Sequence, residues 1–205
     1  LTGYKAYEIK TYGDTKVAFV GIDTPESFTK STPTYFQDAN GNFVYSFAEG
    51  NNGADLYKAV QKAIDAAKAA GADYVIGLGH LGIDEQSSPW MSKEVIANTT
   101  GFDAFIDGHS HTVMENKQVY DAAGKAVTLT QTGSYLANVG KMTIAEDGAI
   151  TTELISTADV SDAAVAATAE AWINDVDTML GEQIATTDIK FYINDPATGK
   201  RRIRT

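Results

Sequence analysis

The chain has 205 residues, 43% of them hydrophobic and 21% charged, which is ordinary composition for one domain or one domain plus a fragment. Its 16 basic and 27 acidic residues give a net charge of −11, which argues against a nucleic-acid polymer as a partner, because phosphate backbones are bound mainly by Lys and Arg. The absence of cysteine excludes disulfides and thiolate metal sites, so any metal must be held by His, carboxylate or amide side chains.

Residues 4–22 predict a β-hairpin. Polar and apolar side chains alternate at its start, turn-forming residues follow at 12–15, and residues 17–22 form an apolar run that we expect to be a buried strand. Residues 23–52 hold Pro, Asn and Gly between aromatic residues, which indicates a long excursion over the core. The aromatics of this segment either line a substrate cleft or pin the segment to the core; they are Tyr35, Phe36, Phe43, Tyr45 and Phe47.

The middle of the chain alternates between helical and strand patterns. Apolar residues at helical spacing predict a helix over residues 54–70, and a second, short helix is expected at 92–98. Short apolar runs predict buried strands at 74–78 and 104–106. Helices that alternate with short buried strands indicate an α/β fold.

The sequence becomes strand-rich after the second of these buried strands. Turn signals separate the predicted strands, which we expect to be antiparallel and which cover residues 118–120, 127–130, 141–145 and 150–155. Ser161 and Asp162 supply N-terminal capping chemistry for a helix that extends to about Leu180, and this helix is expected to be a connector. Residues 184–205 predict the start of a strand and a hairpin.

The two ends of the chain suggest a piece of a longer protein. The start has no Met, no basic segment and no apolar segment of a secretory signal, and the chain ends without a polar tail. No run of about 18 apolar residues occurs, so no membrane span is predicted. Any export signal is expected to lie on the missing part.

The chain has three histidines, and each follows the end of a predicted buried strand. Glycine immediately precedes His80 and His109, and His111 comes two residues later. Ligands of α/β proteins gather beyond strand ends, and a flanking glycine lets the backbone turn sharply there. In an extended stretch His109 and His111 would point the same way, so they could serve one metal or two. Taken singly, each histidine is more often structural than a ligand, but the cluster favours a metal site.

A binuclear metal site needs more ligands than three histidines. Neutral imidazole binds zinc, manganese and iron, and two metals about 3.5–4 Å apart can clamp both oxygens of a phosphoryl transfer. Such a site also needs a bridging carboxylate, and the sequence assigns that role to none of Asp84, Asp103 and Asp107. Asp107 either orients His109 as a hydrogen-bond acceptor or caps the turn.

Four segments resemble the 5'-nucleotidase family of the calcineurin-like metallophosphoesterase superfamily, which includes UDP-sugar hydrolases and 2',3'-cyclic-nucleotide phosphodiesterases. Gly79-His80-Leu81-Gly82 is similar to the family's Gly-His-x-Gly motif, and Gly108-His109-Ser110-His111 to its Gly-His-Ser-(His/Gln/Asn) motif. Residues 129–135 and 139–142 are similar to its next strands. The resemblance implies a four-layer αββα sandwich whose N-terminal part is missing, followed by a C-terminal linker helix.

The resemblance also implies roles for individual residues. His80 and His109 correspond to ligands of one metal, and His111 to a ligand of the other, at a position that varies in the family. The family's upstream Asp-x-His, Gly-Asp and Gly-Asn-His-Glu motifs are absent from this chain. Those motifs supply the bridging aspartate, further ligands and the histidine that assists the leaving group, so we expect only part of the active site here.

The implied protein is a secreted, periplasmic or cell-surface hydrolase of nucleotide catabolism that uses two divalent ions, manganese, zinc, cobalt or iron. Residues 1–157 would be the C-terminal part of its metallophosphoesterase domain, and residues 158–205 a linker helix and the start of a substrate-binding domain. The isolated chain is expected to be nearly inactive. Two alternatives stay open: a cyclic-nucleotide phosphodiesterase, 3'-nucleotidase or related ester hydrolase, and a metal-free surface or binding module.

Overall fold

The computed structural model describes residues 5–188 and 197–198. It divides into two compact units, Leu1–Ala158 and Asp159–Thr205. The strand and hairpin predicted for residues 184–205 fall mostly outside the described residues. No helix of the described part of the chain is long and apolar enough to cross a membrane.

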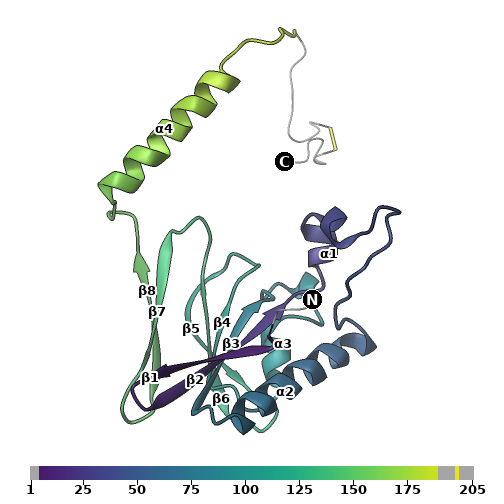
Figure 1. Cartoon of the computed structure of the whole chain (residues 1–205), viewed down its shortest axis with the longest axis vertical. Helices are drawn as coiled ribbons and strands as arrows, with labels where there is room; N and C mark the ends of the chain where they lie inside the picture. The colour runs from purple at the N-terminus through teal and green to yellow at the C-terminus, as the bar shows by residue number, and fades with distance from the viewer. Residues whose placement is uncertain (1–4, 189–196, 199–205) are drawn as a thin grey trace. The chain divides into compact units, whose positions relative to one another are not determined.

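A six-stranded mixed sheet forms the centre of the first unit, in the order β1-β2-β3-β4-β6-β5 (Figure 1). The four inner strands β2, β3, β4 and β6 are parallel to one another, and the edge strands β1 and β5 are antiparallel to their neighbours β2 and β6. The strands are β1 (Tyr7–Tyr12), β2 (Thr15–Asp23), β3 (Tyr74–His80), β4 (Ala104–Asp107), β5 (Val113–Tyr120) and β6 (Ala126–Thr132).

Two helices cover one face of this sheet. Helix α2 (Ala54–Ala69) turns Leu56, Val60 and Ile64 toward the sheet, and helix α3 (Ser92–Ala97) adds Val95 and Ile96 to the same core. In α2 the buried positions recur every three or four residues, which places them on one stripe of the helix. The predicted helices at 54–70 and 92–98 are therefore confirmed.

A two-stranded sheet packs against the other face. Strands β7 (Asn138–Ile144) and β8 (Ile150–Ser156) are antiparallel, and their Met142, Ile144 and Ile150 contact a second cluster that contains Ile76 and Ala104 of the main sheet. Helices, six-stranded sheet and two-stranded sheet make three layers in the described part of the first unit (Figure 1). The predicted α/β fold is confirmed, and these are three of the four layers of an αββα sandwich.

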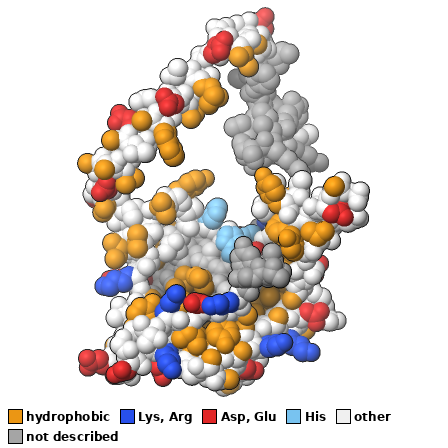
Figure 2. Space-filling model, in the orientation of Figure 1, with side chains coloured by type: hydrophobic (Ala, Val, Ile, Leu, Met, Phe, Trp, Pro, Cys, Tyr) orange, Lys and Arg blue, Asp and Glu red, His pale blue; other side chains and the backbone are white. Residues whose placement is uncertain are grey.

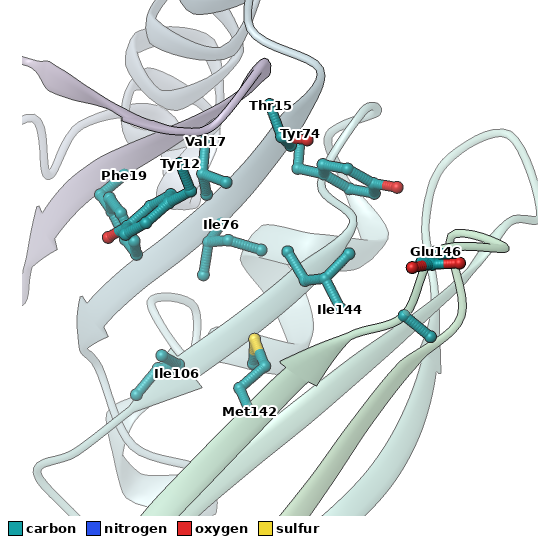
Figure 3. Close-up of a pocket in the computed structure, with 11 residues that line it drawn as sticks. Tyr12, Thr15, Val17, Phe19, Tyr74, Ile76, Ile106, Met142, Ile144 and Glu146 are labelled. Carbon is teal, nitrogen blue, oxygen red and sulfur yellow. The ribbon is translucent and has the colours of Figure 1, made fainter.

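A pocket of about 610 Å³ opens between the two sheets (Figure 3). Val17 and Ile76 of the main sheet line one side of it, and Met142, Ile144 and Glu146 line the other. No histidine is among the residues that line this pocket. Tyr74 and Thr15, which also line it, begin β3 and β2, so the pocket extends toward the opposite end of these strands from His80.

Two details of the later strands differ from the prediction. Strand β5 begins at Val113, five residues before the predicted start; its first half is mostly exposed, and its pairing with β6 is irregular between Met114 and Lys117. The pairs β5–β6 and β7–β8 are antiparallel as predicted, but β6 also pairs with β4 in parallel. Strand β6 therefore continues the parallel part of the sheet.

The segment between β2 and α2 contains three short helices, α1 (Ser27–Lys30), η1 (Pro33–Phe36) and η2 (Asn51–Gly53). Its aromatic residues pack on one another: the Phe28 ring meets Phe36, Phe43 and Phe47 edge to face at centroid distances of 4.6–5.6 Å. Such edge contacts stabilise aromatic clusters by about 0.5–1.5 kcal/mol each beyond burial. The segment thus carries a partly exposed cluster of aromatic rings that contact one another.

The second unit contains helix α4 (Ala163–Leu180). The side chain of Asp162 accepts hydrogen bonds from the backbone N–H groups of Ala164 and Val165, both at 3.0 Å. These bonds satisfy two of the donors that a helix start leaves without partners. The predicted capping chemistry is confirmed, and the role of this helix as a linker between domains stays a prediction.

Candidate functional site

His80 is the last residue of β3, and the glycines before it are required by packing. The buried Phe105 ring of β4 lies against Gly77 and Gly79 of β3. A Cβ at Gly79 would be 2.5 Å from Cε1 of Phe105, closer than real Cβ atoms come. The pattern Gly-x-Gly-His therefore makes room for an aromatic ring of the neighbouring strand and brings β3 and β4 close together.

Asp107, the last residue of β4, fastens this turn to the sheet. Its Oδ1 accepts hydrogen bonds from the backbone N–H groups of Leu81 at 3.0 Å and Gly82 at 3.3 Å, and its Oδ2 accepts one from Nε2 of Gln131 at 3.3 Å. Asp107 is buried, so leaving these donors without partners would cost free energy. The hydrogen bonds of Asp107 thus hold the turn that follows the neighbouring strand β3, whereas its orientation of His109 stays a prediction.

The turn after β4 carries the other two histidines, and it is not extended. His109 has φ 80° and His111 has φ 54°, both in the left-handed region that residues with a Cβ rarely adopt. The stretch is therefore not extended, so the backbone alternation from which a shared imidazole direction was expected does not apply here. Gln131, fully buried in β6, holds the turn through its Oε1, which accepts from the N–H of Thr112 at 2.7 Å and from Oγ of Ser110 at 3.1 Å.

The two turns bring His80 and His109 together. Their rings meet edge to face, with centroids 5.0 Å apart. A Cβ at Gly108 would be 3.2 Å from Nδ1 of His80, and one at Gly82 would be 3.2 Å from Cδ2 of His109. Each imidazole thus lies against a glycine of the other turn, and Figure 2 shows histidine side chains grouped on one face of the molecule.

Glu26 completes the cluster, although no sequence motif pointed to it. Its Oε2 lies 2.8 Å from Nε2 of His109 and accepts a hydrogen bond from Oγ of Ser87 at 2.6 Å, while Oε1 pairs with Nζ of Lys30 at 2.6 Å. Burial raises the pKa of Glu26, but the hydrogen bonds from Lys30, Ser87 and His109 outweigh it, so the pKa is lowered below its ordinary value. The carboxylate is therefore charged at neutral pH.

The pairing of β2 with β3 explains why Glu26 lies near the histidines. Residue Asp23 at the end of β2 is level with His80 at the end of β3, because the two strands are parallel. The carboxyl ends of β2, β3 and β4 therefore meet at one edge of the sheet, and the residues after β2 reach the same place as the histidines. Glu26 follows the end of β2 by three residues and therefore lies at this edge of the sheet.

The histidines could hold a metal ion only together with further ligands. His80 and His109 offer imidazole nitrogens, which zinc, manganese and iron accept as ligands, and their glycine neighbours leave room for both rings. Within the described residues, no group of three or more His, Asp or Glu side chains is arranged to hold a metal ion. Further ligands would have to come from another segment of chain.

The first unit, with its stacked layers and with histidines at the ends of its parallel strands, has the fold of the calcineurin-like phosphoesterases. Among solved structures the chain is similar to the 5'-nucleotidase precursor from Thermus thermophilus, with a TM-score of 0.60, 22% identity and 88% of this chain covered. It is also similar to the calcineurin-like phosphoesterase YfkN from Bacillus subtilis (TM-score 0.59, 19% identity, 88% covered). Another match is the Thermus thermophilus sulfate thiohydrolase SoxB (TM-score 0.61, 17% identity, 89% covered).

The chain spans 36%, 60% and 30% of these three chains, respectively, which is less than two thirds of each. No family model matches the sequence, and no curated protein matches it. At these identities the similarity establishes the fold. The fold that the four sequence motifs implied is therefore confirmed.

Proposed function

We propose that this chain is part of a binuclear-metal phosphoesterase that hydrolyses phosphate esters of nucleotides. The observation that carries the proposal is the meeting of His80 and His109 beyond the carboxyl ends of β3 and β4. In open α/β sheets this is where ligands and catalytic groups gather. The fold is shared with structures described as a 5'-nucleotidase precursor and a calcineurin-like phosphoesterase, which supports this class of chemistry.

In this proposal the residues of the chain bind and orient. His80 and His109 would hold one divalent ion through imidazole nitrogens, and His111 would contribute to a second. Asp107 and Gln131 keep the two histidine turns in register through their hydrogen bonds. Two divalent ions, when bound, neutralise charge on the transferring phosphoryl group and lower the pKa of water. The bridging carboxylate and the remaining metal ligands would come from a segment that this chain lacks. The longer protein that contains both segments would act outside the cytoplasm.

An activity comparison tests the proposal. A longer protein that contains this chain should release phosphate from nucleoside monophosphates in the presence of manganese or zinc, and His109→Ala should abolish the release. The chain alone should be nearly inactive, because its ligand set is incomplete. Turnover by the chain alone that His109→Ala abolishes would contradict the claim that some of the metal ligands lie on another segment. Failure of the longer protein on a panel of nucleotide, cyclic-nucleotide and sulfur esters would contradict the hydrolase.

One observation favours a second candidate, a metal-free binding module. Nε2 of His109 is already engaged by Glu26, and the described residues contain no closed group of ligands. A module of this kind would keep the sandwich fold and lack the hydrolytic activity. It predicts that neither this chain nor a longer protein binds divalent metal ions, and that replacing His80 changes stability alone.

A further inference from the structure

The contact between Glu26 and His109 determines which imidazole nitrogen is available. Nε2 of His109 lies 2.8 Å from Oε2 of Glu26. An ionised carboxylate has no proton and can only accept a hydrogen bond, so Nε2 must donate. A neutral imidazole with its proton on Nε2 presents Nδ1 as its free lone pair.

The carboxylate of Glu26 is itself held in place from two other sides. Ser87, in the 3-10 helix η3 (Glu85–Ser87), donates its hydroxyl to Oε2, and Lys30 of α1 pairs with Oε1. The Glu26 and His109 side chains are only 11% and 13% exposed, so packing restricts any rotation of the imidazole. The Nζ of Lys30, 2.6 Å from Oε1, also favours the ionised carboxylate.

We propose that Glu26 is a positioning residue that fixes His109 in the Nε2–H tautomer and leaves Nδ1 to bind a divalent metal ion. This inference rests on the proposed function, because it concerns the metal that His109 would hold. Histidine ligands of metals usually donate their second ring nitrogen to a carboxylate or carbonyl, which sets the ring orientation and raises ligand basicity. In this arrangement Glu26 acts through His109 and stays off the metal.

The contact joins three segments that are distant in the sequence. Glu26 follows β2, Ser87 lies beyond β3, and His109 lies beyond β4. The carboxylate thus connects the residues that follow three neighbouring parallel strands. This placement gives a charged side chain polar partners at a position where it is largely removed from water.

The first test is the proton position in the metal-free chain. With ¹⁵N-labelled histidine at about pH 8, where an ordinary imidazole of pKa about 6.5 is neutral, long-range ¹H–¹⁵N correlation spectra identify the tautomer. We expect a slowly exchanging Nε2–H resonance for His109. It should disappear in Glu26→Ala and persist in Glu85→Ala, a control at an exposed glutamate of the same region. A wild-type His109 with its proton on Nδ1 overturns the proposal.

The second test adds zinc to the same samples. The Nε2–H resonance of wild-type His109 should survive zinc binding, because the metal takes Nδ1. Glu26→Ala should weaken zinc affinity by about 10- to 100-fold, the usual effect of losing such a partner, and Glu26→Gln, which keeps an acceptor oxygen, by less. Backbone spectra of each variant show whether the fold is intact.

The outcomes distinguish failure of the positioning role of Glu26 from failure of the proposed metal site. Loss of the Nε2–H resonance on zinc binding means that the metal displaces Glu26, which overturns the positioning role. Equal loss of affinity in Glu26→Gln and Glu26→Ala would make Glu26 a direct ligand and also overturn it. A wild-type chain that shows the Nε2–H resonance but binds no zinc overturns the proposed metal site and leaves Glu26 as a structural partner of His109.

Discussion

The imidazole rings of His80 and His109 meet edge to face, with centroids 5.0 Å apart and an interplanar angle of 67°. Neither residue is placed by its own strand alone. Phe105 brings β3 and β4 together over two glycines, and Asp107 holds the turn after His80 against the end of β4. The geometry of the two imidazoles therefore depends on Phe105 and Asp107, neither of which is proposed as a metal ligand.

Replacing Gly79 by alanine should destabilise the chain. The new Cβ would overlap the fully buried Phe105 ring, which has little room to move, and overpacking of this kind costs about 1–3 kcal/mol. Gly21→Ala is the matched control, because no heavy atom lies within 4 Å of a Cβ at that strand glycine. Urea unfolding of both variants measures the difference. Equal stability of Gly79→Ala and wild type would contradict the close approach of β3 and β4.

Replacing Asp107 by alanine should cost about 2 kcal/mol or more. The change leaves the N–H groups of Leu81 and Gly82 without their acceptor, and an unsatisfied buried donor costs about 1–3 kcal/mol. The exposed Asp84 begins η3 without a side-chain capping bond, so Asp84→Ala should change stability by less than about 0.5 kcal/mol. Hydrogen exchange of the Leu81 amide should also accelerate in Asp107→Ala; an unchanged rate would argue that the bond is dispensable.

The stability that Glu26 contributes should depend on pH. Hydrogen bonds lower its pKa in the folded chain below the ordinary 4.5, so the contribution is complete above 4.5 and is lost as pH falls through the folded value. The difference in unfolding free energy between wild type and Glu26→Gln should therefore shrink between about pH 5 and pH 3. Denaturant titrations at a series of pH values measure it, and a difference that grows on acidification would have the wrong sign.

Periodicity in the sequence was enough to predict most of the sheet and its helices. Helix α2 buries apolar residues at helical spacing, and strands β2, β3 and β4 contain short apolar runs, so the structure places these elements where the sequence predicts them. The first half of β5 lacks that signal, because it is held by backbone pairing to β6 and exposes most of its side chains. A strand of this kind leaves little trace in hydropathy.

The candidate site was predictable only in part. His80 and His109 were expected to approach each other, since they follow neighbouring predicted strands, and the structure confirms their contact. The left-handed backbone at His109 and His111 was not expected, because residues with a Cβ rarely adopt it; in the structure the turn is hydrogen-bonded to the distant Gln131 side chain. Glu26 was missed because only the tertiary fold brings it to His109.

The central claim, that the histidines form part of a metal site, is tested most directly by calorimetric titration of this chain with manganese and zinc, beside His80→Ala and His109→Ala. We predict weak binding of about one ion by the wild-type chain, because neutral imidazoles supply only part of a ligand set, and loss of binding in both variants. An absence of binding by the wild-type chain, or binding that both variants retain, would contradict the claim and favour a metal-free module.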